Sequence, residues 1–241
     1  LGLYKQPSAI LNSITSIVTA SLPLVLFSGL SRLHGTGDRN GFLCELIKYQ
    51  RLIALIVMPM CAGIFLYQDL VTQIMLGPQW REAAMAVGAI ALGKIPHLVL
   101  CAPSSVVYRS MGQPRTSVIA QVAFIAVLIP GCILSLLFGY HAFIWTRAAL
   151  YLLFVLIHAV ILRRLIGLRL SQSLSNVGYP TLATLVMAVL ALALRRFGGG
   201  MAYDLTSIAL CAGLYLLLVW KNPSTRELLK YLVVKPGKVQ N

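Results

Sequence analysis

Lys94 is the residue of this chain whose position most clearly indicates chemistry. It lies about eleven residues into the apolar stretch Ala83–Tyr108, a depth of about 16 Å at the rise of an α-helix. That depth is close to the middle of a bilayer core, which is about 30 Å thick. A charge there costs roughly 2.5–3.5 kcal/mol, so an intramembrane lysine indicates a function by default.

Polar side chains follow Lys94 at intervals of three or four residues. They are His97, Cys101, Ser104 and Tyr108, and this spacing predicts that they share one helix face. The same helix carries glycines and prolines that interrupt helices, at Gly88, Gly93, Pro96 and Pro103. Interrupted helices occur at membrane depth where backbone lines a cavity or packs inside protein, so the pattern predicts a pathway wall. The alternative is a lysine that snorkels, or one that is neutral and buried against a carbonyl.

Two other polar residues lie inside predicted spans. The expected first span, Ser8–Leu30, has no charge but carries a polar stripe that includes Asn12. Such a stripe faces protein or water, and both interhelical hydrogen bonding and substrate contact explain it. Arg147 lies one to two turns inside a later span, where it either lines a pathway or snorkels to the nearer interface.

The composition is that of an integral membrane protein. The 241 residues are 59% hydrophobic and 11% charged, whereas a soluble domain carries about 25% charged residues. The mean hydropathy is +0.84. The net charge is +14, but few basic residues cluster with aromatic ones, so we expect no nucleic-acid partner.

The apolar segments predict an all-α bundle of about seven transmembrane helices. The expected spans are 8–30, 51–67, 83–108, 116–138, 141–162, 179–195 and 203–220. The last two are almost purely apolar, so residues 166–220 should add two peripheral helices to those within residues 1–165. Residues 221–241 form a basic tail.

The segment Gln68–Glu82 is too polar and too short to span a membrane. Apolar residues on one face of it, followed by Trp80, predict a short helix along the membrane interface. This apolar face consists of Leu70, Val71, Ile74 and Met75.

The basic residues predict the orientation of the bundle. One set of alternate connections, with the tail, holds about 14 lysines and arginines, and the other set holds about five. By the positive-inside rule the tail is cytoplasmic and the start of the chain is outside. An outside start without a visible leader predicts that further helices precede this sequence.

Residues typical of enzyme and metal sites are not arranged for those functions. The six acidic residues lie in loops or near helix ends and offer no pair for acid–base or glycosyl-transfer chemistry. No phosphate-binding glycine loop occurs, and the histidines and cysteines lack metal-ligand spacing. We therefore predict no enzyme activity, catalytic residue, metal or cofactor.

Several segments resemble a known family. LGLYKQPSAI at the start, YQDLVTQIMLGPQWREAA after the second span and YRSMGQPRTS after the third are similar to the rear half of bacterial polysaccharide exporters. These are the O-antigen-type flippases of the multidrug/oligosaccharidyl-lipid/polysaccharide exporter superfamily. The resemblance covers about Leu1–Thr116. It departs from the family at FSGLSRL, where Ser28-Gly29 replace a usual proline.

The resemblance implies a fold and a function. Residues 1–165 would belong to the second lobe of a two-lobe exporter that works by alternating access in the bacterial inner membrane. Its substrate would be a polyprenyl-diphosphate-linked oligosaccharide for lipopolysaccharide or exopolysaccharide, and its partners would be membrane lipids and other polysaccharide-biosynthesis proteins. An anionic substrate needs cations and hydrogen-bond donors in a wet cleft. The expected binding residues are Lys94, His97, Tyr108, Arg147 and Asn12.

Three other functions remain open from the sequence. A drug or cation antiporter of the same superfamily would need membrane acids, which these spans lack. A membrane polysaccharide polymerase or glycosyltransferase would need an acidic site or a large outer loop. A seven-helix receptor would agree with the predicted number of spans, but no other feature of the sequence indicates one.

Overall fold

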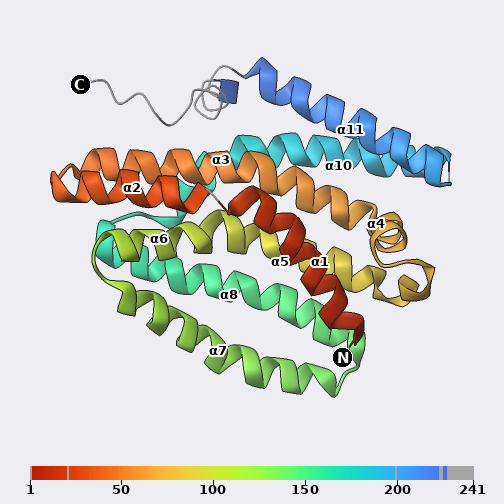
Figure 1. The fold of residues 1–241 in the computed structure, drawn as a ribbon, viewed down its shortest axis with the longest axis horizontal. Coiled ribbons are helices and arrows are strands. Elements are labelled where there is room, and N and C mark those ends of the chain that lie inside the picture. Colours follow the sequence, from red (N-terminus) through yellow and green to blue (C-terminus); the bar gives the residue numbers. More distant parts are fainter. Residues whose placement is uncertain (1, 21, 199, 223–224, 227–241) are drawn as a thin grey trace.

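We analysed a computed structural model that describes residues 2–20, 22–198, 200–222 and 225–226. The regular structure of this described part is entirely helical, as predicted (Figure 1). The α-helices are α1 (Gly2–Thr19), α2 (Leu22–Gly35), α3 (Arg39–Leu66), α4 (Gln68–Met75), α5 (Ala84–Pro96), α6 (Ala102–Ser110), α7 (Pro114–Leu136), α8 (Tyr140–Ile166), α9 (Leu170–Asn176), α10 (Gly178–Phe197) and α11 (Met201–Lys221). A 3-10 helix, η1 (Pro78–Ala83), precedes α5, and a π-helical turn, η2 (His97–Cys101), joins α5 to α6.

Six helical segments of the described part are long and apolar enough to cross a membrane, which confirms a multi-span bundle. The expected first span is not one helix, because α1 ends at Thr19 and α2 begins at Leu22. Pro23 explains the break. A proline lacks the backbone N–H for a helical hydrogen bond and clashes with the carbonyl four residues earlier, but it is tolerated in the first turn of a new helix.

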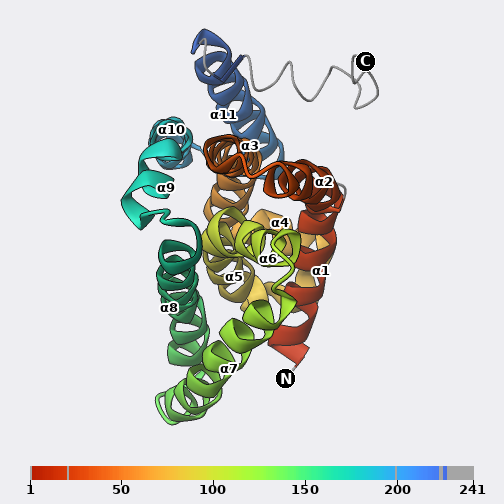
Figure 2. The ribbon, with the colours of Figure 1, turned by 90° about the vertical axis from the view of Figure 1, so that its left-hand side faces the viewer.

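The segment from η1 to α6 forms the centre of the bundle. It packs against α1, α2, α3, α4, α7 and α8, and Figure 2 shows α5 and α6 enclosed by these helices. In its most apolar window 61% of the residues are buried, against 11% for α7, so α7 lies at the periphery.

The central helix widens directly after Pro96. The N–H of Ala102 donates to the carbonyl of His97, five residues back, which is the spacing of a π-helix. The sequence predicted that the helix is interrupted here. The structure shows one wider turn at this point, and the helix continues from α5 through η2 into α6. A π-turn shifts the faces of the residues that follow it.

The helix α3 is longer than expected. Its 28 residues begin at Arg39, whereas the expected span begins at residue 51. Asp38 caps its start by accepting a bond from the N–H of Gly41 at 2.9 Å. Arg39, in its first turn, donates through Nη2 to the carbonyl of Ile166 at 3.0 Å. This bond ties the start of α3 to the end of α8, where Gly167 adopts the left-handed conformation that ends a helix.

The segment expected at the membrane interface contains a short helix, as predicted, and its position at the interface stays a prediction. With eight residues α4 is about 12 Å long, too short to cross a bilayer. Leu70 packs into the bundle, whereas Ile74 and Met75 are about half exposed. Gly77, at φ 91°, then turns the chain into η1.

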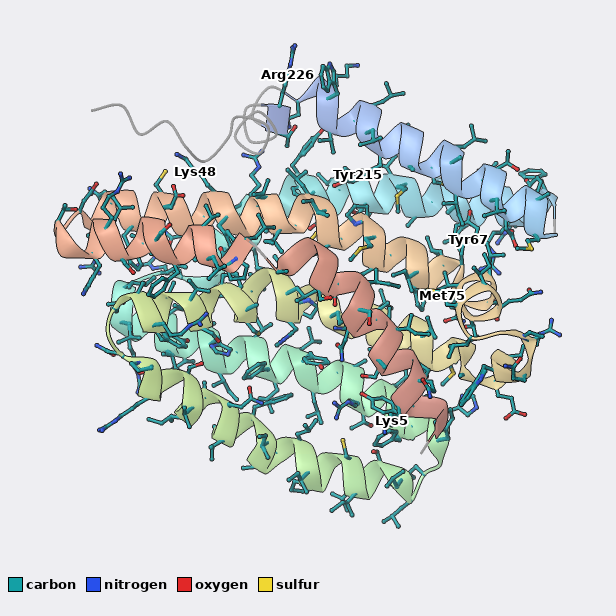
Figure 3. All side chains as sticks on the ribbon, in the orientation of Figure 1. Lys5, Lys48, Tyr67, Met75, Tyr215 and Arg226 are labelled. Atoms are coloured by element: carbon teal, nitrogen blue, oxygen red, sulfur yellow. The ribbon has the colours of Figure 1, made fainter. Side chains whose placement is uncertain are left out.

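The helices α10 and α11 form a pair attached to α3. Tyr215 on α11 donates to the carbonyl of Leu55 at 2.7 Å, and the Tyr67 and Ser207 hydroxyls lie 2.8 Å apart (Figure 3). Between α3 and α11 lies an apolar groove of about 540 Å³. Most of the tail expected at 221–241 lies outside the described residues.

Basic residues concentrate at one end of the bundle. The connections α2–α3, α6–α7 and α8–α9 lie together at the left of Figure 1, and α4–η1, α7–α8 and α10–α11 lie at the right. The first end carries Arg32, Arg39, Arg109, Arg115, Arg163, Arg164 and Arg169, and the second carries Lys5, Arg81, Arg195 and Arg196. The fold thus groups the loops as the charge count assumed, while the orientation in a membrane stays a prediction.

Candidate functional site

Lys94 points from the central helix towards α1. Its Nζ donates to Oδ1 of Asn12 at 2.7 Å and to Oγ1 of Thr15 at 3.2 Å. The Thr15 hydroxyl donates to the carbonyl of Leu11 at 2.7 Å, and a hydroxyl oxygen that donates can also accept from the lysine. Lys94 is only 8% exposed, whereas Asn12 is exposed. The ammonium group therefore lies directly behind a residue that forms part of the surface.

The partners of Lys94 are neutral oxygens. The ion pair found among the described residues joins Arg195 to Asp69, 3.7 Å apart and partly exposed. Cys61 and His97 also lie close enough to Lys94 to interact with its charge, and neither of them has a carboxylate. A charged lysine here is solvated by hydroxyl and amide dipoles, and its positive charge is not cancelled.

The face of α1 that points away from the bundle is polar around Asn12, the partner of Lys94. Gln6, Asn12, Ser13 and Ser16 are all exposed along this face. The exposed side chains of α7 are by contrast mostly apolar, such as Val122. Lipid does not favour a polar helix face, so α1 faces water or another protein surface. We call this exposed polar face of α1, together with Lys94 directly behind it, the α1 site.

His97 and Tyr108 face away from the α1 site. The ring of His97 stacks on that of Phe154 with centroids 5.9 Å apart, and its Nδ1 is buried without a partner. The hydroxyl of Tyr108 lies 2.9 Å from Nδ1 of His158, and Tyr108 is fully buried. The predicted single face is therefore divided, with Lys94 towards α1 and the other two towards α8. The π-turn between Lys94 and Tyr108 accounts for part of this change of face.

Arg147 reaches α1 from α8. Its guanidinium carbon lies 5.0 Å from the centre of the Tyr4 ring, and its Nε is buried without a hydrogen-bond partner. Tyr4 and Asn12 are eight residues apart on α1, which is about 12 Å. Lys94 from α5 and Arg147 from α8 thus both contact α1.

Three residues have roles beside Lys94 that the sequence did not reveal. A Cβ on Gly93 would come within 2.9 Å of Cδ2 of Tyr151 and 3.3 Å of Cα of Ala148, so this glycine allows α8 to pack closely against α5. Tyr4 received no role, because a tyrosine near a helix start has many uses. Thr15 was visible only as one member of the polar stripe.

No metal site accompanies the α1 site in the part of the chain that the structure describes. A search of those residues finds no cluster of three histidine, cysteine or acidic side chains. The site can offer a positive charge, amide and hydroxyl dipoles, and contact with water.

The fold and the α1 site define a multi-span helical membrane protein with a cation behind an exposed polar face. Residues 1–85 match the model of a family described as "Polysaccharide biosynthesis protein". The match contains Asn12 and all of α1, and it ends before Lys94. No curated protein matches the chain.

Proposed function

We propose that this chain is part of a transporter that moves an anionic, lipid-linked oligosaccharide across a membrane. The observation that carries the proposal is the ammonium group of Lys94, which lies behind the exposed side chain of Asn12 in a helical segment long and apolar enough to cross a membrane. A positive charge without an acidic partner attracts an anion, and a diphosphate linker is such an anion. The family match supports a role in polysaccharide biosynthesis.

The polar face of α1 would contact the head group of the substrate. An anion that replaces Asn12 at Nζ would exchange an amide–ammonium bond for a stronger, charge-assisted bond. Arg147 supplies a second cation against the same helix. The exposed hydroxyls of Ser13 and Ser16 now donate to backbone carbonyls but can also accept bonds from sugar hydroxyls.

The proposal includes an orientation and a place of action. The end of the bundle that carries most arginines would face the cytoplasm of a bacterial cell, with the bundle in the inner membrane. Other polysaccharide-biosynthesis proteins would deliver the substrate there. In this proposal the chain transports its substrate and does not catalyse glycosidic bond formation.

Reconstitution tests the transport function directly. The full-length protein is inserted into proteoliposomes that hold a fluorescent polyprenyl-diphosphate oligosaccharide, and a quencher outside the vesicles measures transfer between leaflets. We expect transfer to be faster than in protein-free vesicles. Transfer of a cationic dye without transfer of the oligosaccharide would indicate a cation antiporter. Extension of the sugar chain would indicate an enzyme.

A further inference from the structure

A small cavity with a mostly apolar wall and a few polar side chains lies between α3, α6, α8 and α9. Gln50, Ser104, His158 and Ser173 line it, together with Arg169. Its volume is about 10 Å³, which is close to the least that one water molecule needs. The cavity is separate from the α1 site. Lys94 and its partners Asn12 and Thr15 are not among the residues that line the cavity.

Two polar atoms of the residues that line this cavity lack a hydrogen-bond partner. They are Oε1 of Gln50 and Nε2 of His158, and the two residues are 1% and 2% exposed. A buried polar atom without a partner costs about 1–3 kcal/mol in general, so native proteins supply a partner or a water molecule. Both residues line the same cavity, and a water molecule held there can serve both atoms.

The bond to Tyr108 indicates which nitrogen of His158 carries a hydrogen. The phenol hydroxyl of Tyr108 lies 2.9 Å from Nδ1, and a phenol donates readily to a bare ring nitrogen. Nδ1 is then the acceptor, and Nε2 carries the hydrogen. His158 then has a donor without a partner and Gln50 has an acceptor without a partner, and both residues line the same cavity.

We infer that this cavity is a water site that bridges Nε2–H of His158 to Oε1 of Gln50 and connects His158 to solvent at the α8–α9 end. The water accepts from the imidazole and donates to the amide oxygen, which satisfies both atoms. Arg169 is exposed and lines the cavity, so the cavity reaches the surface at the start of α9. The inference does not depend on the transport proposal.

The neighbours of His158 include Tyr108 on α6, His97 on η2 and Arg169 before α9. None of these three residues has a carboxylate that would stabilise an imidazolium ion. In this proposal His158 is a neutral imidazole whose Nε2–H donates to the water.

Nuclear magnetic resonance can detect this water. The full-length protein is labelled with ¹⁵N-histidine in lipid nanodiscs, and magnetisation transfer from water to each imidazole is measured, with His158→Gln used to assign the signal. His34 and His141 are exposed and serve as positive controls. His97 is a matched negative control, because its Nδ1 is also buried without a partner but it does not line the cavity. We expect transfer at His158 to be at least about ten-fold faster than at His97.

A variant that fills the cavity provides the second measurement. Ser173 is buried in the cavity wall, whereas Ser175 on the same helix is exposed. Ser173→Val should abolish the transfer to His158, and Ser175→Val should preserve it. Transfer at His158 as slow as at His97 in the unaltered protein would overturn the inference, and so would transfer that persists unchanged in a folded Ser173→Val protein.

Discussion

The ammonium nitrogen of Lys94 lies 2.7 Å from the side-chain oxygen of Asn12, and this contact joins the most buried helix of the bundle to an exposed polar helix face. A lysine that snorkels would extend its amine to the membrane surface. This amine instead points sideways into α1, where Thr15 is its second partner. The contact therefore places a positive charge next to the exposed polar face of α1.

A carboxylate at position 12 should stop transport without unfolding the protein. Asn12→Asp places a negative charge at the oxygen that now accepts from Lys94, and the resulting ion pair cancels the charge that attracts the substrate. We expect export to fall at least about ten-fold while the melting temperature in detergent stays the same or rises. Ser175→Asp, which adds the same charge at an exposed position on α9 away from α1, is the control. Full export by a stable Asn12→Asp protein would show that the free charge is not needed.

Gly93→Ala should loosen the contact between α5 and α8. Its Cβ would meet the ring of Tyr151 and the backbone of Ala148, and the backbone cannot rotate away. Overpacking of this kind costs about 1–3 kcal/mol, which thermal unfolding in detergent measures. Gly63→Ala is the matched control, since no atom lies within 4 Å of its Cβ. Equal melting temperatures for the two variants would mean that α8 shifts without cost.

Tyr108→Phe should destabilise the protein. The change removes the hydroxyl that pairs with Nδ1 of His158 and leaves a buried nitrogen without its partner. The expected cost is about 1–3 kcal/mol. A double-mutant cycle with His158→Leu separates the pair from other effects, and additive losses in stability would contradict a bond between them.

Cysteine labelling tests the orientation. In a protein whose native cysteines are replaced, cysteines at exposed Gln79 and Phe197 should react with a membrane-impermeant reagent from outside the cell. Cysteines at exposed Gln113 and Ser175, at the end with most arginines, should react only after the membrane is opened. The reverse pattern would contradict the orientation taken from the charge count.

The sequence predicted those elements whose signal is local. The five apolar spans from α5 to α11 and the short helix α4 follow from hydropathy and length. The break between α1 and α2 was hidden, because Pro23 is compatible with a kink as well as with a new helix. The full length of α3 was missed because its first turns are amphipathic.

The candidate site was predictable as a set of residues and not as an arrangement. Lys94 and Asn12 each stood out as polar residues in apolar surroundings, but they are 82 positions apart and only tertiary packing brings them together. The spacing from Lys94 to Tyr108 assumed a regular α-helix, and a π-turn changes the face of the later residues. Tyr4 carried no signal that distinguishes a partner of Arg147 from an ordinary interfacial tyrosine.

Replacement of Lys94 by methionine tests the central claim. Methionine has a similar length and removes the membrane penalty of roughly 2.5–3.5 kcal/mol, so insertion should not suffer. The measurement is polysaccharide export in a null strain that carries the full-length variant, with its membrane abundance determined in parallel. We predict that Lys94→Met loses export at normal abundance and that Lys94→Arg keeps part of it, since arginine retains the charge in another shape. Full export by Lys94→Met at normal abundance would contradict a role for the Lys94 charge in transport.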